Sequence, residues 1–227
     1  RHEVLLSTEL GQMKYRQLQL RRNHSSSVPN SIDIYTPIYG QYLPELPLFI
    51  NTEEQQRYFA LNLQDQIFLN DQWSVLFGAR FDHITQDFQN KLAGTSSKKD
   101  LQQTSPRLGL NYRLNDRWSW YANYGESFAL NSGMDRNGDV FNPEKGKSYE
   151  IGGKYRITPQ SLLSLALFKM DKENVLTTDP TDSNYQITAG EVSSKGLEVD
   201  LETQLNDQFS IRANYSYTEE KKKKDQI

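Results

Sequence analysis

The sequence contains no cysteine and only three histidines, His2, His24 and His83. Disulfide bonds and thiolate metal sites are therefore excluded, and a histidine-rich metal site is not expected. The formal net charge is −3, whereas a nucleic-acid-binding protein needs an excess of basic residues. We therefore predict that the chain has no nucleic-acid partner.

Long hydrophobic runs are missing as well. Hydrophobic residues make up 36% of the chain, and no segment approaches the ~20 consecutive apolar residues of a membrane-spanning helix. A membrane is still possible, because a transmembrane β-strand needs only about ten residues of which every second one is apolar. The start does not resemble a secretory signal, since Arg1-His2-Glu3 leads directly into a strand pattern. We therefore expect the chain to begin in the middle of a structure.

What the sequence does contain is a repeated hexapeptide, found at Leu69–Ser74, Leu114–Ser119 and Leu205–Ser210. Each copy reads Leu-Asn-Asp, then any residue, then an aromatic and Ser. Asn and Asp tolerate the left-handed backbone of tight turns, so each copy predicts a β-hairpin turn. The first two copies are about 45 residues apart and the third follows at twice that interval, with a degenerate turn at Ile157–Leu162 between them. The repeating unit is therefore a pair of strands.

Between these turns, apolar and polar residues alternate with period two, which predicts strands. Long loops are expected at residues 22–54, 89–103 and 130–147, and a short one at 179–183. The predicted fold class is all-β, an antiparallel up-and-down transmembrane β-barrel, here a partial barrel of about nine strands. The nine predicted strands are His2–Arg16, Gln56–Leu69, Trp73–Asp82, Ser105–Leu114, Trp118–Gly125, Ser148–Ile157, Ser161–Leu176, Tyr185–Leu205 and Phe209–Tyr217.

The placement of the aromatic residues indicates what covers the apolar face. Trp73, Trp118 and Phe209 each follow a short turn, which would set them at one level of a closed sheet. Aromatic side chains prefer the headgroup layer of a membrane, so this level predicts the girdle of an outer-membrane barrel. Two alternatives remain. The same aromatics could lie in the core of a soluble sandwich, and a propeller also repeats at about this interval, although each blade would need four short strands.

Four segments of the chain form an ordered set of motifs: Phe77–Asp82, Ser105–Gly109, Phe141–Lys154 and Ser193–Val199. The third contains a Pro-Glu pair followed by Tyr-Glu-x-Gly-x-Lys. In this order the four segments resemble TonB-dependent outer-membrane receptors, especially ferric-siderophore receptors. The resemblance implies that residues 1–227 are a portion of the middle and later part of the family's barrel.

Several parts of that family have no counterpart in the chain. These are the N-terminal plug domain, the box that engages TonB and the remaining strands of a barrel of about 22. Nine strands alone would leave backbone groups unpaired in lipid, so we expect that they do not insert without the rest.

For a whole receptor, the resemblance implies uptake of an iron(III)–siderophore complex across the bacterial outer membrane. Energy would come from the TonB complex through the plug, and outer-membrane lipid would be a further partner. The resemblance indicates a transport protein and not an enzyme, with no catalytic residue, no metal site and no bound cofactor. The iron(III)–siderophore is then the transported ligand. The alternatives are a soluble all-β binding module, which would extract without detergent, and a passive porin-like channel, which would conduct ions without energy input.

A site for a bulky chelate needs flat apolar side chains that desolvate it and a few donors that orient its oxygens. Aromatics of the first long loop are the leading candidates, followed by polar groups on the inner face of the barrel. In this order, the candidate ligand-binding residues are Tyr35, Tyr39, Tyr42, Phe49, Tyr121, Asn123 and Arg107. Alternatively, the loop tyrosines pack against their own loop and Arg107 pairs with a carboxylate.

Three further patterns predict no site. Asp135–Asp139 resembles a calcium loop, but its glycine comes early and no closing glutamate follows, so a solvated turn is favoured. Asp171, Glu173 and Asp179 could form an acid pair for hydrolysis, but nothing in the sequence would raise their pKa. The run Lys221–Lys224 could attract anionic lipopolysaccharide, although we favour the start of a solvated loop.

Overall fold

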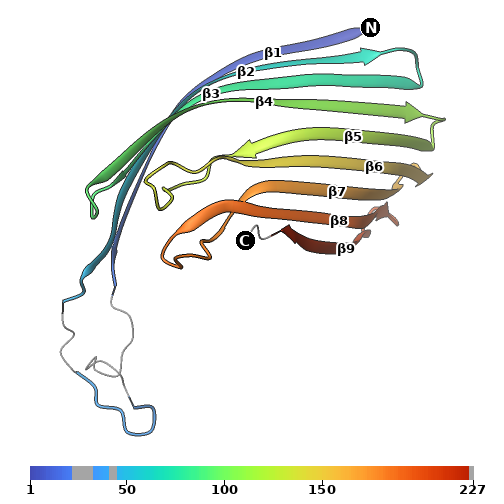
Figure 1. Cartoon of the computed structure of the whole chain (residues 1–227). Helices are drawn as coiled ribbons and strands as arrows, with labels where there is room; N and C mark the ends of the chain where they lie inside the picture. The colour runs from blue at the N-terminus through green and yellow to red at the C-terminus, as the bar shows by residue number, and fades with distance from the viewer. Residues whose placement is uncertain (22–32, 41–44, 225–227) are drawn as a thin grey trace.

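The computed structural model describes residues 1–21, 33–40 and 45–224, and these form one curved antiparallel sheet (Figure 1). Its nine strands are hydrogen-bonded in sequence order, which confirms the predicted up-and-down topology. The strands are β1 (His2–Leu20), β2 (Leu48–Phe68), β3 (Trp73–Asn90), β4 (Thr95–Arg113), β5 (Trp118–Ala129), β6 (Glu144–Thr158), β7 (Ser161–Thr178), β8 (Gln186–Gln204) and β9 (Ser210–Lys224). No helix among the described residues is long and apolar enough to cross a membrane.

The repeated hexapeptide forms the same turn three times. In the first copy, the Asn70 side-chain oxygen accepts hydrogen bonds from the backbone N–H groups of Gln72 and Trp73, at 2.9 and 2.8 Å. Asn115 and Asn206 make the equivalent bonds in the other two copies. The asparagine thus replaces a missing backbone partner and closes the turn. This confirms the predicted hairpin turns, although no residue of the three copies adopts the left-handed backbone expected there.

At the opposite end, several strands are longer than the sequence predicts. The expected loop at 89–103 is wrong, because β3 continues to Asn90 and β4 begins at Thr95. Likewise, β2 begins at Leu48, within the expected loop 22–54, and β6 begins at Glu144. The outward positions of these extensions are mostly polar, and scattered apolar residues such as Ile84, Phe88 and Leu101 lie on the inner face. A strand that leaves the hydrocarbon no longer needs an apolar face, so the period-two signal disappears while the backbone pairing continues.

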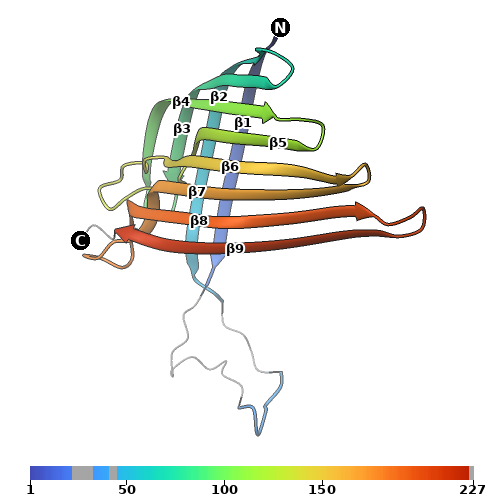
Figure 2. The same ribbon diagram turned by 90° about the vertical axis from the view of Figure 1, so that its right-hand side faces the viewer.

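The outer face of the sheet is apolar over its whole width. One row of paired residues crosses from β2 to β9 with an apolar or aromatic side chain on every strand. The row is Ile67, Val75, Leu110, Ala122, Ile151, Leu167, Leu197 and Tyr217. Ile151 and Leu167 are 57% and 52% exposed, and Figures 1 and 2 show a single sheet with no second layer of protein packed on it. The soluble-sandwich alternative is therefore wrong.

An aromatic girdle borders this face at the short-turn end. Trp73 stacks on Tyr112 with ring centroids 4.3 Å apart, and Trp118 stacks on Tyr155 at 4.2 Å. Trp118 also lies parallel to Trp120, at 5.7 Å. Trp73, Trp118 and the exposed Phe209 all lie directly after short turns, at the level that the sequence predicts.

One charged residue, Asp65, interrupts the apolar outer face. Its Oδ2 atom lies 2.7 Å from the Nδ1 atom of His2 on β1. The register places Asp65 between Val4 and Phe77 on the neighbouring strands. A carboxylate in hydrocarbon is costly when unpaired, and the histidine is its partner in this position.

The segment between β5 and β6, residues 130–143, covers the inner face of the sheet at the long-loop end, opposite the short turns. Val140 and Phe141 of this segment are buried, as are Ile84 and Phe88 of β3. These four residues make up most of the buried hydrophobic side chains among the described residues. The molecule therefore has a small apolar core where a loop packs on strands, and not between two sheets.

Candidate ligand-binding site

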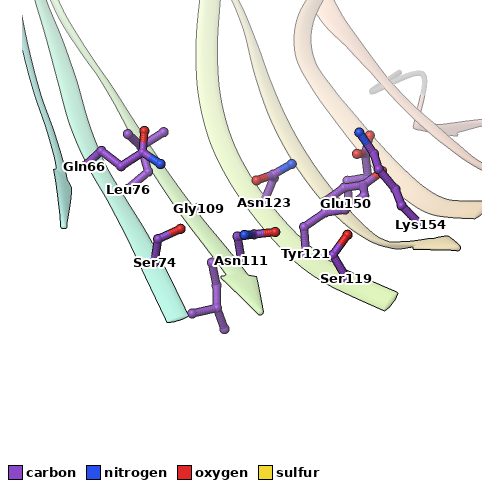
Figure 3. A pocket seen from close by; sticks show the side chains of 11 residues that line it. Gln66, Ser74, Leu76, Gly109, Asn111, Ser119, Tyr121, Asn123, Glu150 and Lys154 are labelled. Carbon is purple, nitrogen blue, oxygen red and sulfur yellow. The ribbon is translucent and has the colours of Figure 1, made fainter. Parts of the chain in front are cut away.

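A cavity of about 540 Å³ lies on the inner face near the short-turn end (Figure 3). Side chains from β2 to β6 line it, and most of them are uncharged hydrogen-bonding groups. The lining residues are Gln66, Ser74, Leu76, Gly109, Leu110, Asn111, Ser119, Tyr121, Asn123, Glu150 and Lys154. Its volume lies within the range of small-molecule sites, roughly 300–1,000 Å³. We refer to it as the luminal cavity.

Two of the candidate residues, Tyr121 and Asn123, lie together in the luminal cavity on β5. The Tyr121 ring lies over Gly152, where a Cβ atom would be only 2.4 Å from the ring. Its hydroxyl group hydrogen-bonds to the Glu150 carboxylate. Gly109, the register partner of Asn123, leaves space beside the Asn123 amide. Glycines on the neighbouring strands therefore allow both side chains to lie along the wall.

The candidate Arg107 lies on the same face, one inward-facing position along β4 from Gly109. It lines a separate hollow of about 360 Å³ together with Glu9, Tyr58 and Arg80. Its aliphatic stem crosses Gly78, where a Cβ atom would be 2.8 Å from Cγ of Arg107. Within the described part of the chain, the Arg107 guanidinium has no hydrogen bond or ion pair. The alternative was a carboxylate partner on the plug or on an adjacent strand, and none of the described strands provides one.

The carboxylates near Arg107 are already engaged by other groups. Arg80 Nε donates to both carboxylate oxygens of Asp82 at 3.0 Å, and Arg80 Nη1 donates to Glu9 Oε2 at 3.0 Å. The Tyr58 hydroxyl donates to Glu9 Oε1 at 2.9 Å. This network uses Glu9 and Asp82, and Glu126, the third carboxylate that lines the hollow, accepts from the Tyr124 hydroxyl, so Arg107 remains an available cation among the described residues.

A second cavity, of about 570 Å³, lies at the opposite end of the sheet. We refer to it as the extracellular cavity, because the long-loop end of such a barrel faces the exterior. Its apolar side chains come from strand ends and connections that are distant in sequence, and they include Phe49, Phe88, Leu92, Met134, Phe141 and Tyr185. Arg136 adds a cation, which hydrogen-bonds to Thr181 Oγ1 at 2.7 Å.

The leading aromatic candidates do not form one group. Phe49 lines the extracellular cavity but belongs to β2 and not to the expected loop. Tyr35 and Tyr39 are 88% and 79% exposed, and neither lines the luminal or the extracellular cavity. Tyr42 lies outside the described residues. The structure therefore separates the loop tyrosines from the inner-face candidates.

The docking of residues 130–143 against the strands is a feature that sequence reasoning missed. Gln86 is fully buried, and its Nε2 atom donates to Glu54 Oε1 at 2.7 Å and to the Asn131 carbonyl at 2.9 Å. The Ser132 hydroxyl donates to Glu54 Oε2. Glu54 is only 3% exposed. The described side chains that donate hydrogen bonds to its carboxylate are all neutral. Inward-facing and outward-facing residues alternate along β2, and Tyr58 and Ala60 face inward. Counting back from them at every second residue would have placed Glu54 on the inner face as well.

The same segment is also tied to β4 and β7. Asn174 adopts the left-handed conformation, with φ 59°, within an irregularity of β7. Its side chain donates to the Pro143 carbonyl at 2.9 Å, and its own carbonyl accepts from Asn131 Nδ2 at 2.9 Å. Lys99 of β4 donates to the Val140 carbonyl at 3.2 Å. Contacts from four strands thus hold the wall of the extracellular cavity.

At the tip of this segment, Asp135 forms the solvated turn that the sequence favours. Its Oδ1 atom accepts hydrogen bonds from the backbone N–H groups of Asn137 and Asp139, at 2.8 and 2.9 Å. Gly138 adopts φ +86°, which completes the turn. The carboxylate therefore stabilises its own loop.

Comparison with known proteins agrees with this architecture. A family model described as "TonB dependent receptor-like, beta-barrel" matches residues 3–226. The metal-pseudopaline receptor CntO of Pseudomonas aeruginosa strain UCBPP-PA14 is 36% identical over 233 residues, which cover 100% of this chain and 33% of that receptor. The ferrioxamine B receptor of Salmonella typhimurium strain SL1344 is 31% identical over 96% of this chain and 32% of its own length.

Among solved structures, the closed form of the ferric-catecholate import receptor Fiu from K12 E. coli superposes with a TM-score of 0.77. The match is 20% identical and covers 98% of this chain and 35% of that structure, so it shows the fold. The chain thus spans about a third of the length of these relatives.

Proposed function

Because this chain belongs to the TonB-dependent receptor β-barrel family, we propose that its nine strands form part of the wall of a receptor for a ferric-siderophore complex. Members of this family are receptors and transporters of the bacterial outer membrane. The receptor carries the complex inward across that membrane with energy supplied through TonB. This activity belongs to the whole receptor, of which the chain provides about a third by the length of its relatives.

One observation carries the proposal. Arg107 is a cation on the inner wall that no described residue pairs with, next to the neutral donors Tyr121 and Asn123 and behind an apolar outer face. A ferric chelate presents negatively charged oxygens, which a guanidinium binds through charge-assisted hydrogen bonds. Neutral amide and hydroxyl groups orient such a ligand without trapping it. This part of the wall therefore suits a ligand that binds reversibly during transport.

The extracellular cavity provides the first contact in this scheme. Phe49, Phe141 and Tyr185 give it flat surfaces that desolvate the organic part of the chelate. Arg136 gives it a positive charge at the same level. The ligand then passes from this cavity toward Arg107 and the luminal cavity.

A second candidate cargo is a chelate of another metal. It is favoured by the 36% identity that the whole chain shares with a metal-pseudopaline receptor. Arg107 and the luminal cavity recognise the chelate's oxygens and amides, and no side chain of this wall needs to contact the metal. The metal carried is therefore set by the chelator.

The test is uptake by cells that produce the intact receptor in a strain that lacks its other metallophore receptors. Cells receive ⁵⁵Fe or ⁶⁵Zn complexed with a panel of siderophores and metallophores, with a TonB-deficient strain as the control. We expect accumulation of one chelate class that requires TonB and falls with the Arg107→Gln change. Equal accumulation without TonB would support a passive channel and overturn the proposal, and ⁶⁵Zn uptake in place of ⁵⁵Fe would establish the second cargo.

A further inference from the structure

Strand β4 loses its neighbour β5 partway along its length. It pairs with β3 from Thr95 to Tyr112, but with β5 only from Arg107 to Arg113. Figure 1 shows β5 leaving β4 well before the extracellular end of β4. The hollow of about 360 Å³ that Arg107 lines lies at this separation, with residues 126–128 of β5 on its wall. Residues 95–106 of β4 therefore have a neighbouring strand on one side only.

Hydrogen bonds at the turns identify the residues of β4 that face this open edge. The Arg113 N–H donates to the Gln72 carbonyl on the β3 side, whereas the Leu114 N–H donates to the Trp118 carbonyl of β5. Backbone groups of successive residues point to opposite sides of a strand, so the even-numbered residues of β4 are directed toward β5. Beyond the separation these are Pro106, Thr104, Gln102, Asp100, Lys98 and Ser96. Within the described part of the chain, no strand pairs with them on this side.

Pro106 occupies the first unpaired position. Proline has no backbone N–H, so within sheets it is confined to places where no hydrogen bond of the ladder is lost. The N–H that Pro106 lacks would have pointed toward β5, while its pairing with Ala79 places it in register with β3. The sequence thus ends the pairing with β5 at Pro106 and lets β4 continue beside β3.

Closure of a barrel does not fill this edge. Both neighbours of β4 already belong to the described sheet, so further strands would add only at its outer edges, β1 and β9. Strand β9 itself continues to Lys224, so the solvated loop expected to start at residues 221–224 is wrong. The edge at residues 95–106 is therefore a separate feature within the wall.

The open edge lies outside the hydrocarbon. Its outward side chains are all polar and exposed, namely those of Ser96, Lys98, Asp100, Gln102 and Thr104. The inward Leu101 between them is buried. Unpaired backbone groups are not tolerated in lipid, and this polar surface is where they can bind water instead. The edge is thus accessible from the extracellular solution.

A groove of about 430 Å³ lies beside the outer end of this edge. Lys98 and Lys99 line it on β4, and Phe141 and Ile187 add apolar surface from the docked segment and from β8. Lys99 Nζ crosses to the docked segment, where it donates to the Val140 carbonyl at 3.2 Å. A strand added to β4 would direct its inward side chains into this groove.

The charges beside the edge restrict what such a strand can carry. Asp135 and Asp139 line the groove and disfavour acidic side chains on the inward side. Lys98 faces outward, and among the described residues its ammonium has no ion pair. Asp100, the next outward residue, accepts a hydrogen bond from Thr85 Oγ1 at 2.6 Å. The site therefore suits apolar inward side chains and a carboxylate opposite Lys98.

We propose that the open edge of β4 binds an extended segment of an extracellular protein as an added antiparallel strand. The free backbone groups recur at every second residue, about 7 Å apart, which is the repeat of another polypeptide strand. Main-chain hydrogen bonds give affinity in such strand addition, and alternate side chains give specificity. Residues 95–106 accommodate about ten residues of the partner. The inference depends on the outer-membrane location and not on the ligand that the receptor transports.

Hydrogen exchange at single residues tests the edge itself in the intact receptor, purified in detergent and analysed by mass spectrometry with electron-transfer fragmentation. We expect the amides of residues 96, 98, 100, 102 and 104 to exchange quickly, and those of 97, 99, 101, 103 and 105, which face β3, to exchange slowly. Slow exchange at both sets would show that another loop or a second copy already fills the edge, and would overturn the proposal.

The probe for binding is a synthetic decapeptide in which valine alternates with glutamate and threonine. N-methylation of its glutamates and threonines removes the N–H groups directed at β4, whereas N-methylation of its valines removes only those directed away. We expect the parent and the valine-methylated peptide to slow exchange at the even-numbered amides, and the other form to bind at least about tenfold more weakly. Any other order of the two methylated forms, or no binding of the parent at about 1 mM, overturns the proposal.

Two variants at one position test the receptor's side of the contact. Gln102→Pro removes an N–H at the open edge, as Pro106 does naturally, and Gln102→Ala is the matched control that removes the same side chain. We expect Gln102→Pro to bind the decapeptide about tenfold more weakly and Gln102→Ala to bind it as the wild type does. Heat-modifiable migration on gels verifies folding. Equal binding by the two folded variants would overturn the proposal, and unchanged chelate uptake in both would leave the proposed function standing.

Discussion

Glu53, near the extracellular end of β2, shows how a single residue holds the rim of the sheet together. Lys14 Nζ, Lys91 Nζ and Arg16 Nε lie 2.5, 2.7 and 2.9 Å from its carboxylate oxygens. Hydrogen bonds from Lys14 and Lys91 lower the pKa of Glu53 from 4.5 to about 2. A carboxylate whose pKa is lower in the folded state stabilises that state above its unfolded pKa.

The contribution of Glu53 should therefore be complete above pH 4.5 and disappear as the pH falls toward 2. We expect hydrogen-exchange protection factors of the ends of β1 and β2 to decline over this range in the wild type. In Glu53→Gln, these ends should already be less protected at pH 7 and should show no such decline. Equal protection of the two proteins at pH 7 would contradict the role assigned to this carboxylate.

Arg107 is the residue on which ligand recognition depends in the proposed function. Arg107→Gln should weaken binding of the transported chelate about tenfold or more, because a charge-assisted hydrogen bond contributes ~1.5–3 kcal/mol. Arg107→Lys should retain part of the affinity. Ligand titration by fluorescence quenching measures both, with Arg113→Gln on the same strand as the control. An unchanged Kd in Arg107→Gln would remove Arg107 from the site.

At the scale of elements, residues 130–143 form the lid of the buried Glu54–Gln86 pair. Gln86→Ala removes a donor from a buried carboxylate, which costs ~1–3 kcal/mol and should loosen the segment. Trypsin should then cleave after Arg136 faster than in the wild type. Gln102→Ala, at an exposed position on β4, is the control. Cleavage at the wild-type rate in Gln86→Ala would show that the docking does not depend on this pair.

The elements differ in how much of them the sequence reveals. The turns were predictable because Asn70, Asn115 and Asn206 use the same local chemistry each time. The membrane-facing strands were predictable because one face must be apolar. The outer ends of β2, β3 and β4 were not, because their outward positions there are mostly polar, while scattered apolar residues such as Ile84 and Phe88 lie on the inner face. The docked loop was hidden for another reason, since Glu54 and Ser132 are 78 residues apart and no local pattern links them.

The candidate site was also predictable from the sequence only in part. Tyr121, Asn123 and Arg107 could be placed on the inner face from strand parity alone, and the structure puts them on adjacent strands. That Arg107 has no partner among the described residues depends on the network among Glu9, Arg80 and Asp82, which joins β1 to β3 and leaves no trace in sequence.

At the scale of the whole molecule, the apolar outer face should not tolerate a charge near the middle of the hydrocarbon. Leu165→Lys places an ammonium group at the middle one of the outward apolar positions Leu163, Leu165 and Leu167 of β7, which costs ~2–4 kcal/mol on the lipid face of a barrel. We expect the intact receptor with this change to fold into lipid vesicles with a lower yield, measured by heat-modifiable migration. Ser164→Lys, on the inner face of the same strand, should fold as the wild type does. Equal yields for the two variants would be inconsistent with a lipid-facing Leu165.

The central claim is that one face of the sheet meets hydrocarbon while the other meets a wet interior. This chain contains no cysteine, so once any cysteine elsewhere in the receptor has been replaced, single cysteines at each position of 163–168 can carry a spin label in the intact receptor in lipid bilayers. Collision rates with lipid-soluble oxygen and with a water-soluble nickel complex then report the surroundings of each label. The structure predicts that oxygen is favoured at positions 163, 165 and 167 and nickel at 164, 166 and 168. Rates that do not alternate, or that alternate in the opposite phase, would contradict the account.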